Sequence, residues 1–133
     1  MRSLYTKADQ LSQVAIGSAI EVHRLKGPGL IESIYERCLM RELELRHVAA
    51  VNQRVVKIEY RGLLFDEPLR FDVLIEACLL LELKCAQEIL PIHKAQRLSY
   101  MRLLDVPLGL FINFHEMKLV DGLVRMILPG ANR

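Results

Sequence analysis

The chain lacks the features that mark several large classes of protein. Its 133 residues include three cysteines, Cys38, Cys78 and Cys85, which form no C-x-x-C pair. Their odd number and apolar surroundings indicate buried free thiols, which are usual in a reducing compartment. The first ten residues hold no apolar core of a signal peptide, and no run approaches the length of a membrane span. We therefore expect a cytoplasmic protein with no membrane segment.

Other absences narrow the chemistry. The net charge is only +2 and the 18 basic residues are scattered, so overall charge does not indicate nucleic-acid binding, although it leaves room for a local basic surface. The four histidines are spread out without the spacing of a zinc site. The segment "GPG" at 27–29 lacks the pattern of a phosphate-binding loop and is typical of a helix stop.

What the chain has in excess is apolar side chains. They make up 52% of its residues, which excludes disorder, and the length is sufficient for one domain over residues 1–133 with its own core. An apolar surface covered by a partner or by a second copy of the chain would explain the excess, and we expect a homodimer.

Periodicity predicts an α/β fold. Apolar residues recur at helical spacing in three segments and at strand spacing or in short continuous runs in five others. The predicted helices are 6–26, 30–46 and 92–104, and the predicted strands are 54–60, 69–75, 78–84, 108–114 and 123–128. Turns are expected at 61–62 and 76–77. The strand–helix–strand order at 78–114 predicts a right-handed crossover that joins two parallel strands, so the sheet is mixed.

Charged residues interrupt the most apolar part of this pattern. Asp72 lies in "RFDVLI", while Glu82 and Lys84 lie in "LLLELK". Side chains alternate across a strand, so Glu82 and Lys84 share a face. If the hairpin is centred on Ala77, Asp72 and Glu82 are each five residues from its tip and lie opposite each other. Their repulsion is expected to raise at least one of the two pKa values, and Lys84 is expected to oppose that shift.

Two interpretations of this cluster are open. In the first, it is a buried carboxylate–lysine pair with a structural role only. In the second, a divalent cation lies between the carboxylates, and oxygen ligands suit Mg²⁺ or Mn²⁺. The spacing D-x9-E-x-K does not decide between them.

Polar residues of two predicted helices can reach the same place. Glu32 and Tyr35 share a face of the helix at 30–46, although a carboxylate in a first turn is also an ordinary helix-start residue. Gln96 and Tyr100 share a face of the helix at 92–104, although such a glutamine is often simply solvated. Basic residues on the two helices suit either phosphate binding or solvated surfaces; they are Arg37, Arg41, Lys94 and Arg97.

Taken in order, these motifs resemble a known family. "GLIESIY" at 29–35 fits G-x-x-E-x-x-Y, and "RFDVLI", "LELK", "HKAQRLSY" and "LGLFINF" follow. The chain is similar to the GxxExxY protein family of the PD-(D/E)XK nuclease-like superfamily over nearly its whole length. The residue before Asp72 is Phe71 rather than proline, a departure that is common in the superfamily.

The resemblance implies a nuclease-like core, a mixed central sheet flanked by helices, with a Mg²⁺ (or Mn²⁺) site on it. By this resemblance Asp72 and Glu82 bind the cation, the backbone carbonyl of Leu83 completes its coordination, and Glu32 is a further ligand. Lys84 positions and activates the attacking water, and Gln96 supports the site. Tyr35 and Tyr100 are then structural or substrate-positioning residues.

Two further functions stay open beside a Mg²⁺-dependent nuclease acting on DNA or RNA. One is a catalytically inactive nuclease-like domain that binds nucleic acid or a partner protein, which the modest charge and the absence of a recognition domain favour. The other is a purely structural ion-pair cluster. Intact signature residues favour the nuclease.

Overall fold

Five strands form one mixed sheet at the centre of the molecule. The structure is a computed structural model that describes residues 1–86 and 90–133. The strands lie side by side in the order of the chain: β1 Ala50–Tyr60, β2 Leu63–Ile75, β3 Leu79–Lys84, β4 Leu108–Asn113 and β5 Leu123–Ile127. The central strand β3 pairs with β4 in parallel, and the other neighbours are antiparallel. The predicted fold class and the parallel pair are confirmed.

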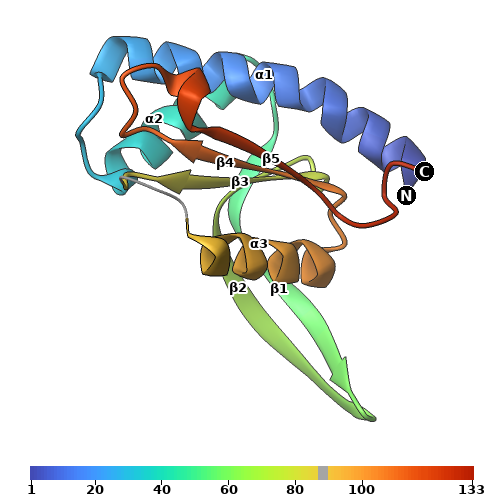
Figure 1. Ribbon diagram of the computed structural model, residues 1–133. Helices are drawn as coiled ribbons and strands as arrows, with labels where there is room; N and C mark the ends of the chain where they lie inside the picture. The colour runs from blue at the N-terminus through green and yellow to red at the C-terminus, as the bar shows by residue number, and fades with distance from the viewer. Residues whose placement is uncertain (87–89) are drawn as a thin grey trace.

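Helices cover both faces of this sheet (Figure 1). α1 (Arg2–Lys26) and α2 (Glu32–Leu45) lie on one face, and α3 (Pro91–Leu104) lies on the other. A short 3₁₀ helix, η1 (Leu119–Gly122), precedes β5 and was not predicted. None of the helices in the described part of the chain combines the length and the apolar character that crossing a membrane would need.

The two faces of the sheet bury separate hydrophobic clusters. The larger cluster joins α1 and α2 to the odd-numbered leucines of β3, Leu79, Leu81 and Leu83. The smaller cluster joins α3 to Leu80 of β3 and Phe111 of β4. Because side chains alternate along a strand, Glu82 and Lys84 continue the row of Leu80 and lie on the face that α3 covers.

Gly109 allows α3 to approach this face closely. A Cβ atom at position 109 would lie 3.0 Å from Sδ of Met101, which is fully buried on α3. Met101 therefore packs directly over β4, and its contact fixes the height of α3 above the charged end of β3.

The hairpin of β1 and β2 is longer than the sequence predicted. The strands expected at 54–60 and 69–75 extend over 50–60 and 63–75, although the turn at Arg61-Gly62 is confirmed, with positive φ angles of 48° and 89°. The end of the hairpin around this turn, where 54–60 pair with 63–69, projects beyond α3 as an arm (Figure 1). Pro68 argues against a strand, but β2 pairs with β3 only at Val73–Ile75, so Pro68 interrupts no ladder on that side.

The other predicted elements agree with the structure within a few residues at their ends. The tight turn at Glu76-Ala77 is confirmed, and both residues have positive φ, 46° and 57°. This turn sets the register in which Val73 pairs with Leu81 and Ile75 with Leu79. Extended by one residue, the same register places Asp72 opposite Glu82.

Candidate functional site

A pocket of about 570 Å³ lies where α2, α3 and the first three strands meet. Its lining is dominated by polar side chains, and among the charged ones three are acidic and three are basic. The acidic residues are Glu36, Asp72 and Glu82, and the basic residues are Arg70, Lys84 and Arg97.

An irregularity in β2 helps to form this pocket. Val51 pairs with Leu74 while Gln53 pairs with Arg70, so residues 71–73 of β2 lie against the single residue Asn52 of β1. Such bulges bend a strand and redirect its side chains. Here the bulge lies where β2 leaves β3 for the projecting arm, and both Phe71 and Asp72 line the pocket.

Asp72 is half-buried and tied to β3. Its Oδ2 accepts a hydrogen bond of 2.7 Å from the backbone N–H of Leu83. Burial raises the pKa of Asp72 above its usual range, while the Leu83 hydrogen bond and the positive charges of Arg97 and Lys84 oppose the shift. The upward shift of the Asp72 pKa and the opposing effect of Lys84 were both expected. The largest cause of the shift, however, is burial, not the repulsion between carboxylates that the sequence suggested.

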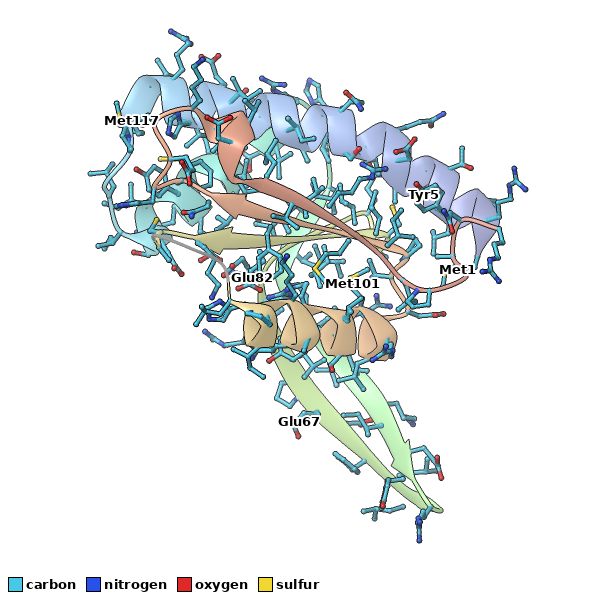
Figure 2. All side chains as sticks on the ribbon, viewed as in Figure 1. Met1, Tyr5, Glu67, Glu82, Met101 and Met117 are labelled. Carbon is cyan, nitrogen blue, oxygen red and sulfur yellow. The ribbon has the colours of Figure 1, made fainter. Side chains whose placement is uncertain are left out.

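Glu82 lies between two cations. Its Oε1 is 3.5 Å from Nζ of Lys84, and its Oε2 forms an ion pair with Nη2 of Arg97. The three side chains are 12%, 23% and 4% exposed, respectively. Figure 2 shows Glu82 on the side of the sheet that faces α3, the side on which Met101 also lies. Glu82 is thus held in a nearly closed environment by charges on both sides.

Arg97 keeps its charge in this environment. Burial lowers its pKa to about 10, and the nearby carboxylate of Asp72 opposes the decrease. The side chain is therefore a cation at neutral pH. It lies over the ring of Tyr100, with 5.2 Å between the guanidinium carbon and the ring centroid.

Glu36 supplies the third carboxylate of the pocket. It lies on α2, and its pKa is raised by burial first and by the charge of Asp72 second. A hydrogen bond with Asn52 and the charge of Arg70 oppose this shift. The shift shows that Glu36 and Asp72 share one electrostatic environment.

Glu32 and Tyr35 do not line the pocket. The Oε1 of Glu32 accepts a hydrogen bond of 3.3 Å from the N–H of Cys85, next to Lys84. The hydroxyl of the buried Tyr35 donates to the carbonyl of Gly27 and accepts from the N–H of Leu30, so it closes the loop before α2. Metal binding by Glu32 remains a prediction, and Glu36, one turn further along α2, lies in the pocket itself.

The other predicted residues divide between the pocket and its support. Gln96 and Tyr100 line the pocket with Asp72, Glu82 and Lys84. The side chain of Leu83 points into the larger core on the opposite face. Only the backbone of Leu83 is beside Asp72, which is consistent with a role for its carbonyl rather than its side chain.

Three residues near the site were missed or not distinguished by the sequence analysis. Glu36 follows Glu32 by four residues, a helical spacing that makes it a second candidate on the same face but does not show which of the two enters the pocket. Arg97 precedes the buried Met101 by four residues, so it interrupts an apolar stripe of α3. Asn113 is 3% exposed, and its amide exchanges hydrogen bonds with the backbone of Ala86, which anchors the chain just after Lys84.

The other three basic residues considered on these helices lie at the surface. This agrees with the interpretation that they are solvated. Arg37 and Lys94 are exposed, and Arg41 pairs with Glu44 at the surface. Of the four basic residues considered on these helices, Arg97 is the one that lines the pocket.

The donor chemistry of the pocket fits a hard divalent cation. Within the described residues, no group of three or more His, Cys, Asp or Glu side chains is arranged to hold a metal. Mg²⁺, however, is commonly bound by one or two carboxylates and completes its coordination with water and substrate oxygens. Asp72 and Glu82 would hold it, because they are carboxylates of facing strands in one pocket.

Comparison with known proteins gives a family match. A family model described as the PD-(D/E)XK nuclease superfamily matches residues 9–126, which include every charged residue of the pocket. No curated protein and no solved structure matches the chain significantly.

Proposed function

Because the chain belongs to the PD-(D/E)XK nuclease superfamily, we propose that it is a Mg²⁺-dependent nuclease that hydrolyses phosphodiester bonds of nucleic acid. The observation that supports this proposal best is the convergence of Asp72, Glu82 and Lys84 in one pocket, with Gln96 beside them. In metal-dependent hydrolysis of a phosphodiester, carboxylates can hold the cation and an amine can act on the attacking water.

Each residue then has a distinct task. Asp72 and Glu82 would hold the cation, with the carbonyl of Leu83 beside them and either Glu32 or the better-placed Glu36 as a further ligand. The bound cation would lower the pKa of a water and stabilise negative charge on the phosphate. Lys84, on the same face as Glu82, would hold the attacking water and a phosphate oxygen. Gln96 would support the catalytic site, Tyr100 would position the substrate, and Tyr35 would fix the loop before α2.

The test is a cleavage screen over single- and double-stranded DNA and RNA with Mg²⁺, Mn²⁺ or a chelator. The wild-type chain should cleave at least one substrate only when the cation is present, and Lys84→Ala should reduce that cleavage by about 100-fold or more. Lys94→Ala is the matched control, because Lys94 is exposed on α3 and does not line the pocket. Cleavage that persists in the chelator would contradict the proposal.

We also propose the narrower assignment to the GxxExxY family within this superfamily. It is supported by "GLIESIY" at 29–35. The glutamate of this motif accepts a hydrogen bond from Cys85 beside Lys84, and its tyrosine closes the loop before α2. A substitution of Tyr35 by Phe keeps the stacking on Phe114 but removes both hydroxyl hydrogen bonds. If the motif serves the site, this variant should cleave less well while remaining folded.

One observation favours the second candidate function, an inactive nuclease-like domain that binds nucleic acid or a partner protein. Both oxygens of Glu82 already face cations of the chain itself. Calorimetry with Mn²⁺ in the presence of a cleavage-resistant oligonucleotide separates the two functions: a nuclease binds Mn²⁺ and loses the binding in Asp72→Ala, whereas an inactive domain binds no Mn²⁺ at millimolar concentration.

A homodimer remains a further proposal, and the projecting arm supports it. Apolar side chains of the arm are exposed, and its charges have both signs, so two arms related by a two-fold axis can complement each other. The apolar residues are Val55, Tyr60, Leu63, Leu64 and Phe65, and the charged ones include Arg54, Lys57, Glu59, Arg61, Asp66 and Glu67. Light scattering that shows only monomer at high concentration would remove this proposal.

A cytoplasmic location is proposed on the cysteines. In the part of the chain that the structure describes, Cys38, Cys78 and Cys85 are all free thiols. Burial raises the pKa of both Cys78 and Cys85, so both thiols are protonated at neutral pH and react slowly with oxidants. Free, unreactive thiols suit a reducing compartment.

A further inference from the structure

Arg97 is the least exposed member of the charged group formed by Glu82, Lys84 and Arg97. Its side chain is 4% exposed, compared with 23% for Lys84. It occupies the position in the apolar stripe of α3 that precedes Met101 and Leu104, both of which are buried against the sheet. The packing of α3 therefore holds Arg97 against Glu82, whereas Lys84 contacts Glu82 from the same strand.

The contacts of Arg97 leave much of its guanidinium unused. Nη2 forms an ion pair with Oε2 of Glu82. That oxygen, Nε and Nη1 are all closed to solvent and have no hydrogen-bond partner among the described residues. Buried donors without acceptors cost free energy. A pair whose only role was to stabilise the fold would be expected to use these donors, so the arrangement points to a second position of Arg97 in which they are used.

The charges of the pocket determine when that second position would be taken. Three carboxylates face three cationic groups, so a free divalent cation meets no net negative charge there. At Glu82 it also meets the guanidinium, which already occupies Oε2. A phosphate that enters the pocket adds negative charge and offers acceptors that suit the planar fork of an arginine.

We propose that Arg97 competes with the divalent cation for Glu82, so that the site takes up the cation together with a nucleic-acid phosphate rather than alone. This inference rests on the proposed function, because it concerns the same carboxylates. When the cation binds Glu82, the guanidinium moves to the phosphate, where Nε and Nη1 donate to its oxygens. Arg97 thus makes binding of the cation depend on the presence of substrate.

The test is calorimetric titration with Mn²⁺, with and without a single-stranded oligonucleotide whose phosphorothioate linkages resist cleavage. Wild type should bind Mn²⁺ at least about tenfold more tightly when the oligonucleotide is present. Arg97→Gln should bind Mn²⁺ alone at least about tenfold more tightly than wild type, because the competing charge is gone. Arg97→Lys keeps the charge and should restore an affinity near that of wild type.

Arg102→Gln is the matched control, since Arg102 is exposed on the same helix and lies outside the pocket. The affinity of Arg102→Gln for Mn²⁺ should equal that of wild type. Equal affinities of wild type and Arg97→Gln for Mn²⁺ alone would overturn this inference and leave the nuclease proposal intact. No Mn²⁺ binding by any variant, with or without the oligonucleotide, would defeat both. If Arg97→Gln does not fold, wild type decides: equal affinity with and without the oligonucleotide overturns the inference.

Discussion

The two faces of β3 carry the same number of side chains but have different roles. On one face Leu79, Leu81 and Leu83 are buried under α1 and α2. On the other face Leu80 is buried under α3, but Glu82 and Lys84 follow it into a pocket. One strand thus contributes to a purely apolar core on one side and to a charged site on the other.

This difference shows how the fold supports costly charges. The apolar face is continuous along the whole strand, so it fixes β3 in the sheet regardless of what lies on the other face. On the charged face only the first residue, Leu80, is needed for packing. The other two side chains are free to form the site, because β2 is irregular there and leaves β3. Substitutions on the two faces should therefore affect different properties, stability on one and chemistry on the other.

The largest effect is expected on the charged face at Asp72, the facing carboxylate on β2. Asp72→Ala should reduce Mg²⁺-dependent cleavage by about three orders of magnitude or more, because the cation supplies several kcal/mol of transition-state stabilisation. The rate is measured under single-turnover conditions, and circular dichroism should show an unchanged fold. Asp66→Ala, on the exposed arm of the same strand, is the control and should retain the wild-type rate. Equal losses in both variants would break the comparison.

A smaller effect on chemistry is expected at Lys84. Lys84→Ala should reduce cleavage about 10²–10⁴-fold, the usual contribution of a group that acts on the attacking water. The amine acts on water and phosphate rather than on the cation, so the affinity for Mn²⁺ in the presence of the oligonucleotide should change far less than the rate. A loss of Mn²⁺ affinity as large as the loss of rate would show instead that Lys84 serves mainly to organise Glu82.

On the apolar face the effect should be on stability. Leu81 is fully buried, so Leu81→Ala should lower the free energy of unfolding by about 2–5 kcal/mol, measured by urea denaturation. Leu63, which is 61% exposed on the arm, gives the control: Leu63→Ala should change it by no more than about 0.5 kcal/mol. The fraction of Leu81→Ala that remains folded should still cleave, because the charged site is intact in it. A stable but inactive Leu81→Ala would contradict the division between the faces.

The smallest effect concerns the energetic cost of the charged face. Because burial raises the pKa of Asp72 in the folded chain, its ionisation opposes folding. This cost is fully present above the folded pKa and disappears below the unfolded pKa, about 4 for an aspartate. Asp72→Asn should therefore melt slightly above wild type at pH 7 without metal, and the difference should vanish as the pH falls below about 4. A difference that grows toward acidic pH would reverse the sign and refute this account.

Much of the fold could be predicted because it depends on local patterns. The helical and strand periodicities, the Arg61-Gly62 turn and the tight turn at Glu76-Ala77 are all present in the structure. The length of the arm could not be predicted, since Asp66, Glu67 and Pro68 disfavour a strand locally. They are accepted there because the arm has solvent on both faces and β2 has no second partner along it.

The candidate site was predictable where it follows the strand register and not where it depends on packing between elements. Alternation along β3 and counting from Ala77 brought Asp72, Glu82 and Lys84 to one face, and all three line the pocket. Helical position alone could not distinguish Glu32 from Glu36 as the residue that enters the pocket, because the choice depends on how α2 rests on the sheet.

The sequence by itself determined the α/β class, the order of the elements and the row of charges on β3, because alternation and turn chemistry act between near neighbours in the chain. The tertiary structure decided that Glu82 is shared between Lys84 and Arg97, and that Arg97, among the basic residues of the helices, lies buried in the pocket. The physical reason is that the pairing of a buried charge depends on which side chains the packing of α3 against the sheet brings within a few ångströms. The contact between Gly109 of β4 and Met101, one turn after Arg97 on α3, sets that distance.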